Sequence, residues 1–122
     1  MIAATPSQAR VVLTLARVYV GLGRARRGVA LAEIAAEARP ACVETRRTLL
    51  RGYLALGRHR EVLVQIDALL EHEFDSGELA FALGMQSRAL HALGRSEQAR
   101  DAWRQFGELC AIARLDPEAM LA

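Results

Sequence analysis

The chain has 122 residues, of which 52% are hydrophobic but only 5% aromatic. Alanine (23 residues) and leucine (18 residues) supply most of the apolar content, and because both favour helices the composition predicts a single all-α domain. All 16 basic residues are arginine, and they exceed the 14 acidic residues by only two, which gives no reason to expect nucleic acid or an anionic membrane as a partner.

Localisation is indicated by what the sequence lacks. Arginines interrupt every apolar stretch before about 18 residues, so we expect no membrane insertion. The N-terminal residues lack the basic start and apolar core of a secretory signal. Cys42 and Cys110 are far apart and lack the spacing of metal ligands, which suits a reducing cytoplasm.

The helices can be placed in chain order from their end signals. Thr5, Pro6 and Gln8 form a capping box with proline at the first helical position. Asp116 and Pro117 begin a C-terminal tail that is too short for another full helix. Between these points the sequence predicts six helices, near residues 6–22, 25–38, 42–56, 59–72, 77–93 and 96–114.

Three segments of the chain are alike: residues 15–24, 49–58 and 86–95. Each has arginine third and an apolar residue fifth, and each ends in Leu-Gly-Arg. The first two are 34 residues apart; a three-residue insertion within 71–78 accounts for the longer second interval. Thirty-four residues is the period of the tetratricopeptide repeat, a family that this chain resembles.

The resemblance implies three helix-turn-helix repeats stacked into a short right-handed α-solenoid. The repeats would cover about residues 9–41, 43–75 and 80–113 of one domain spanning 1–122, followed by a tail at 115–122. Glycines would form the turns, and small residues would allow close helix contacts; the expected contact residues are Ala16, Ala32, Ala35 and Ala99. Arg46, Gln86 and Ser87 depart from the family pattern.

In this family the first helix of each repeat lines a concave groove, at positions that share one helical face. Arg17, Arg51 and Arg88 would stack there as an arginine ladder beside apolar side chains. Such a groove suits a peptide with apolar anchors and acidic or carbonyl groups, and this is the interpretation we favour; the alternative is that the arginines serve only to keep an exposed face soluble. The predicted partner-binding residues are Leu13, Arg17, Val20, Arg47, Arg51, Leu54, Phe81, Arg88 and His91.

The end of the array is expected to lack a cap. Trp103 and Phe106 lie on the last full helix, and only Met120 and Leu121 are available to shield them. Because a solenoid end needs a polar cap or a neighbour, this end face is a possible contact for a partner, or for self-association through the third repeat.

The sequence contains no sign of catalysis. It has no nucleophile elbow, no phosphate-binding loop and no zinc-protease motif. The histidines do not pair at ligand spacing with one another or with a cysteine. We therefore expect no enzymatic activity, no cofactor and no metal.

A narrower resemblance is to the small YscY-type chaperones of bacterial type III secretion. The matching features are the glycine turn of the first repeat, the arginine-rich segment 44–51 and the aromatic last helix at 96–109. This resemblance implies a non-enzymatic chaperone in the bacterial cytoplasm that forms a heterodimer with a small YscX-like export component and helps to dock it at the export gate. A general tetratricopeptide scaffold, and a chaperone of a needle subunit or translocator, remain alternatives.

Overall fold

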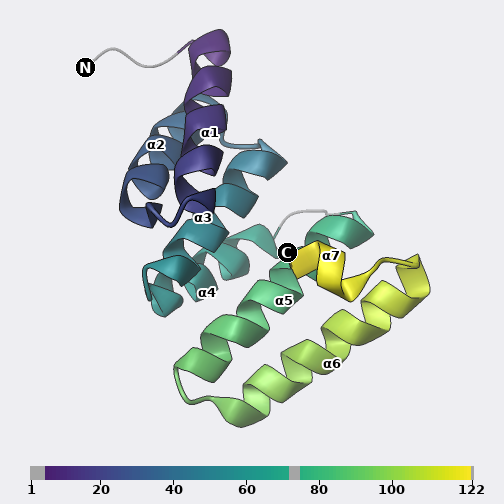
Figure 1. The fold of residues 1–122 in the computed structure, drawn as a ribbon. Coiled ribbons are helices and arrows are strands. Elements are labelled where there is room, and N and C mark those ends of the chain that lie inside the picture. Colours follow the sequence, from purple (N-terminus) through teal and green to yellow (C-terminus); the bar gives the residue numbers. More distant parts are fainter. Residues whose placement is uncertain (1–4, 72–74, 122) are drawn as a thin grey trace. The chain divides into compact units, whose positions relative to one another are not determined.

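The structure, a computed structural model, describes residues 5–71 and 75–121, and all regular structure in these two ranges is helical (Figure 1). The all-α prediction is confirmed. Five of the six predicted helices match within one residue at each end, and α4 ends at Leu69 rather than at 72, a position outside the described residues. The helices are α1 (Pro6–Gly21), α2 (Ala25–Ala38), α3 (Val43–Ala55), α4 (His59–Leu69), α5 (Ser76–Ala92), α6 (Ser96–Ala113) and α7 (Pro117–Leu121).

The helix ends explain this agreement. At the start of α1, Gln8 donates its backbone N–H to the Thr5 hydroxyl at 3.2 Å, and the Gln8 side chain accepts the Thr5 N–H at 2.9 Å, so the capping box is present. The three turn glycines, Gly23, Gly57 and Gly94, have φ of +79°, +73° and +78°, which is left-handed backbone that glycine adopts most readily.

Contacts along the chain divide it into two compact units, Met1–Gly57 and Arg58–Ala122. The first unit contains α1, α2 and α3, and the second contains α4, α5, α6 and α7. Each unit is described by itself below. The stacking of three repeats in one solenoidal domain remains a prediction.

In the first unit, α2 packs against both α1 and α3. Glycine permits the close approach at each contact: a Cβ added to Gly28 would lie 2.5 Å from Cγ2 of Val20 on α1, and one added to Gly52 would meet Val29 on α2. The alanines expected at helix contacts, Ala16, Ala32 and Ala35, are 0–1% exposed. The phenolic OH of Tyr53 donates to Glu33 at 3.4 Å and links α3 to α2.

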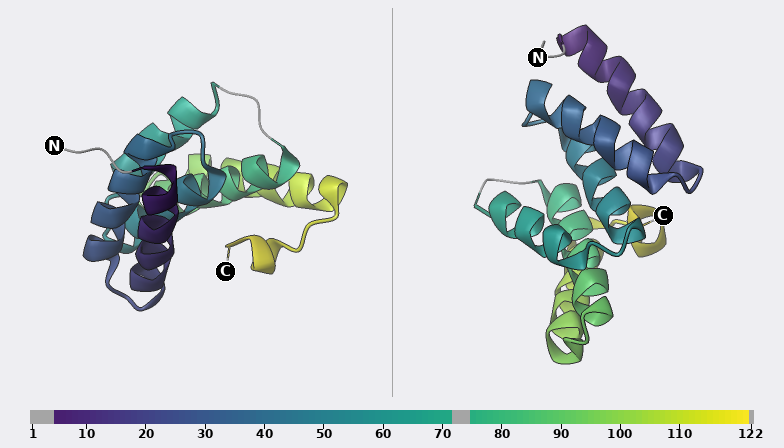
Figure 2. Two further views of the ribbon diagram at one scale, coloured as in Figure 1. Left: turned by 90° about the horizontal axis from the view of Figure 1, so that it is seen from above. Right: turned by 90° about the vertical axis from the view of Figure 1, so that its left-hand side faces the viewer.

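In the second unit, α5 packs against α4, α6 and α7, and Figure 2 shows α5 and α6 running side by side. Phe81, Met85 and Phe106 are almost fully buried in this core. Ser87, a departure from the family pattern, is also buried; its hydroxyl donates to the carbonyl oxygen of Ala99 at 2.8 Å and so joins α5 to α6. The tail that was expected to be too short for a full helix contains the five-residue helix α7.

Candidate protein-binding surfaces

The predicted arginine ladder divides between the two units. In the first unit, Arg17 on α1 donates to Glu44 on α3 at 3.5 Å, and both side chains are more than half exposed. Arg47 and Arg51 follow Glu44 along α3 and are half-buried. Arg88 is exposed but belongs to the second unit, so the three-arginine ladder remains a prediction. The structure brings together Arg17 and Glu44, an exposed ion pair of the kind that contributes little stability.

The apolar residues expected beside this ladder are less accessible than the prediction requires. Leu13 is 7% exposed and Phe81 only 2%, so both serve the core instead of presenting a surface. Val20 is half-buried because it packs against Gly28, and Leu54 is also half-buried. His91, which was predicted on the same surface, is exposed. Helices α1, α3 and α5 carry apolar residues on more than one side. The repeat positions used to predict the groove do not distinguish the buried side from the exposed one.

The C-terminal helix covers part of the face predicted for the groove. Figure 1 shows α7 folding back beside α5. Leu121 is 8% exposed, and a Cβ added to Gly84 would lie 2.5 Å from its Cδ2 atom. Gly84 is one helical turn from Phe81, on the side of α5 that was expected to face a partner. The protein therefore covers this part of α5 with its own chain.

The end face predicted at Trp103 and Phe106 is exposed only in part. Trp103 is 50% exposed, whereas Phe106 is 1% exposed and belongs to the core. The spacing along α6 explains the difference, because Phe106 shares one helical side with the buried residues Ala99, Ala102 and Cys110. The two rings remain in contact, with centroids 5.0 Å apart. Only Trp103 of this pair presents a large apolar surface.

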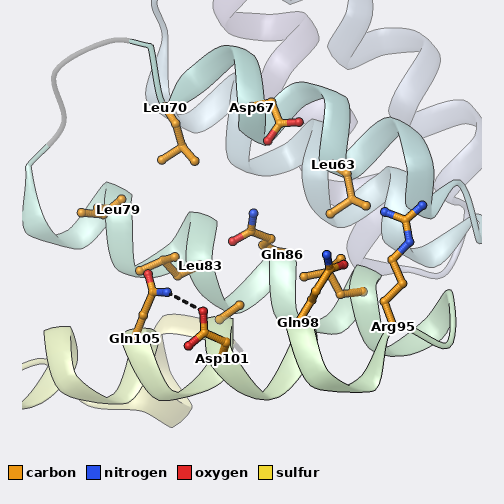
Figure 3. Close-up of a pocket in the computed structure, with 12 residues that line it drawn as sticks. Leu63, Asp67, Leu70, Leu79, Leu83, Gln86, Arg95, Gln98, Asp101 and Gln105 are labelled. Atoms are coloured by element: carbon orange, nitrogen blue, oxygen red, sulfur yellow. Dashed lines mark hydrogen bonds between the residues drawn. The ribbon is translucent and has the colours of Figure 1, made fainter.

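The second unit contains an open groove of about 530 Å³ bounded by α4, α5 and α6 (Figure 3). Leucines from α4 and α5 form most of its base, and the side chains around its edge are polar. Asp67 comes from α4, while Gln98, Asp101 and Gln105 come from α6. We call this feature the unit-two groove; its lining residues are Leu63, Asp67, Leu70, Leu79, Leu83, Gln86, Leu90, Arg95, Gln98, Asp101, Ala102 and Gln105.

Asp101, at the edge of the unit-two groove, is held by neighbouring side chains of α6. The Asp101 carboxylate accepts hydrogen bonds from Arg104 at 2.6 Å and from Gln105 at 3.0 Å. The hydrogen bond from Arg104 is the main reason that the pKa of Asp101 is lowered, so this carboxylate is ionised near neutral pH. Six of the twelve lining residues are apolar and six are polar, so the groove offers both kinds of contact to an amphipathic helix.

The sequence interpretation missed the unit-two groove. One signal was available: Gln86 is a polar residue at a position that the repeat pattern usually makes apolar. In the structure its side chain is half-buried and points into the groove (Figure 3). The groove is lined by three helices, α4, α5 and α6, and no local sequence pattern predicts how three helices are placed around a groove.

Among residues 5–71 and 75–121, no group of three or more His, Cys, Asp or Glu side chains could hold a metal ion. Cys42 and Cys110 are both free thiols. No helix in the described parts of the chain is long and apolar enough to cross a bilayer. No protein-family profile and no curated protein matches this sequence.

Proposed function

We propose that this chain is a non-enzymatic, protein-binding tetratricopeptide module that holds a short segment of a partner protein. The observation that carries the proposal is the unit-two groove, which leucines line together with amide, carboxylate and guanidinium groups. Three further features support the repeat assignment: the glycine turns at 34- and 37-residue intervals, the packing of consecutive helices within each unit, and the buried small residues at the helix contacts.

Within that class, we propose a cytoplasmic chaperone of bacterial type III secretion that binds a small YscX-like export component. The support is the resemblance in layout: three repeats, an arginine-rich second repeat and an aromatic last helix. The exposed arginines Arg17 and Arg88 would meet acidic or carbonyl groups of the partner. A general scaffold for other proteins is the second candidate. The lack of a metal-binding group among the described residues does not distinguish the two candidates, because neither requires a metal.

Co-expression tests this proposal. The full chain would be produced with a tagged YscX-like export component, and separately with a needle subunit and a translocator from the same secretion system. The proposal expects a 1:1 complex with the YscX-like component that survives size-exclusion chromatography. Stable capture of the needle subunit or translocator alone would move the assignment to those chaperone classes. Failure with all three would leave the general scaffold.

Paired arginine variants then locate the binding surface. R51A combined with R88A is expected to weaken the complex about tenfold or more, because charge-assisted hydrogen bonds to the partner would be lost. R26A combined with R60A removes two exposed arginines from α2 and α4, outside the predicted surface, and is the matched control. Equal affinities of the two double variants for the partner would show that the predicted arginine surface is not used. Circular dichroism would confirm that both remain helical.

A further inference from the structure

The outer side of α1 carries four large apolar residues, Val11, Leu15, Val18 and Leu22, which are 46–70% exposed. Their spacing of four, three and four residues is that of a coiled-coil seam, so they form one stripe along the helix. The buried residues Leu13 and Ala16 lie on the opposite side. Single exposed apolar residues are ordinary, but a continuous stripe marks a contact surface. We call these four residues the α1 stripe.

The unit-two groove has the same length and periodicity as this stripe. Along α5 its base consists of Leu79, Leu83, Gln86 and Leu90, again spaced four, three and four residues apart. The α1 stripe and this base each extend over eleven residue steps, about 16 Å of helix. Leu83 and Leu90 are 8% and 7% exposed and also serve the core, so the half-buried Leu79 and Gln86 are the α5 side chains that a docked helix of this pattern would contact most.

Charge also favours contact between the two surfaces. The segment Met1–Gly57 contains nine arginines and three acidic residues, and Arg58–Ala122 contains seven arginines and eleven acidic residues. The net charge of +2 is thus the sum of +6 on the first unit and −4 on the second. Locally, α1 carries Arg10 and Arg17 and no acidic side chain. The groove is lined by Asp67 and Asp101 on opposite sides and by one cation, Arg95, and Asp101 is paired with Arg104.

We propose that the protein associates with itself head to tail, the α1 stripe of one copy occupying the unit-two groove of another. Direct pairing of two α1 stripes would bring two units of +6 together, whereas the head-to-tail contact pairs opposite charges. Because stripe and groove are different surfaces, every pair retains one free stripe and one free groove, unless the chain of contacts closes. This inference does not depend on the identity of the secretion partner.

The expected association is reversible. One helix face in one groove buries an area at or below the roughly 1,200 Å² that separates weak from stable interfaces, so micromolar protein is required. The full chain would be examined by sedimentation velocity from about 1 to 200 μM in 50 mM NaCl. The average mass is expected to rise with concentration, and 500 mM NaCl is expected to weaken association about threefold or more because salt screens the two units.

Two variants remove one surface each. L15E places a charge in the α1 stripe, and Q86R fills the centre of the groove with a cation; each is expected to weaken self-association by about 30-fold or more. The decisive sample is their equimolar mixture. Because L15E retains an intact groove and Q86R an intact stripe, the mixture should form a 1:1 dimer that grows no further.

Two matched controls separate this effect from misfolding. I34E charges an α2 residue that is 48% exposed, close to the 46% of Leu15, and Q65R repeats the glutamine-to-arginine change on α4 outside the groove. Both should associate as the unchanged chain does. The proposal is overturned if the unchanged chain is monomeric at 200 μM, or if the mixed variants do not dimerise. It is also overturned if Q86R associates normally while L15E does not, because that result would indicate pairing of two α1 stripes.

Discussion

The two cysteines occupy opposite chemical environments. Cys42 is the N-cap residue of α3, and although its neutral thiol makes no cap hydrogen bond, its thiolate lies near several stabilising groups. Burial alone would raise the pKa of Cys42; hydrogen bonds from the Thr45 hydroxyl and from the backbone N–H groups of Thr45 and Glu44, together with the charge of Arg39, outweigh burial and lower it. Cys110 is 1% exposed, and burial followed by the charge of Asp116 raises its pKa.

These environments predict selective alkylation. At pH 7–8 the lowered pKa of Cys42 favours its thiolate, whereas burial and the raised pKa of Cys110 disfavour its thiolate, so iodoacetamide should modify Cys42 at least about tenfold faster than Cys110. The Cys42 rate should fall as the pH is lowered through its folded-state pKa. Mass spectrometry of timed samples measures both sites, and C42S should abolish the fast phase. Equal rates in the native protein would contradict these environments.

Arg114 is the non-glycine residue with positive φ in the described chain, at φ 56° and ψ 44° where α6 ends. This conformation lets Leu115 donate its N–H to the carbonyl oxygen of Cys110 at 2.8 Å. A side chain there costs about 1 kcal/mol. R114G is therefore expected to stabilise the fold by about 0.5 kcal/mol, the remainder being offset by the larger backbone entropy of glycine when unfolded. Urea unfolding measures the change, and A113G in the last turn of α6 should destabilise instead.

Among the elements, α7 depends on the lack of a side chain at Gly84. An alanine there would press against the flexible end of Leu121, and a leucine would need the space that Leu121 occupies. G84L is therefore expected to displace α7 from α5 and to lower the free energy of unfolding by about 1–3 kcal/mol. Carboxypeptidase digestion followed by mass spectrometry would show faster removal of the C-terminal residues.

A second glycine provides the control for this substitution. Gly107 lies within α6, and a Cβ added there meets no atom within 4 Å. G107L therefore gains helix propensity without a clash and should stabilise the protein by up to about 1 kcal/mol. If G84L and G107L had the same effect on stability and on digestion, the contact between Leu121 and Gly84 would not hold α7 in place.

The helices could be predicted from the sequence because their ends carry local signals. Gly23 and Gly94 lie in the turns directly after α1 and α5, and Thr5 caps the start of α1. The position of α7 could not be predicted, because it is set by Gly84, which lies 37 residues before Leu121 in the chain. A five-residue helix also has too few positions to display a period.

The candidate surfaces were harder to predict for a related reason. In a chain rich in alanine and leucine, a helix can be apolar on two sides, and the repeat register does not decide which side is buried. Leu13 was expected on a binding surface and is buried, whereas the exposed residues Val11 and Val18 were given no role. The sequence likewise does not decide which face of α6 is buried; in the structure that face contains Phe106.

At the scale of the whole molecule, the helices that pack together are near neighbours in the chain. Within the first unit these pairs are α1 with α2, α2 with α3, and α1 with α3; in the second, α5 contacts α4, α6 and α7. Each unit has its own buried residues, including Leu50 in the first and Ile66 in the second. Because these contacts are local, a lost core contact should affect nearby amides most.

Native-state hydrogen exchange tests this expectation with a matched pair of variants. L50A and I66A each remove an aliphatic side chain that is at most 2% exposed and should cost about 2–5 kcal/mol locally. L50A is expected to accelerate amide exchange mainly in α1–α3, and I66A mainly in α4–α6, when each is compared with the unchanged chain. If either variant accelerated exchange equally in both segments, the two units would unfold as one cooperative body, because a defect in one core would then destabilise every helix to the same extent.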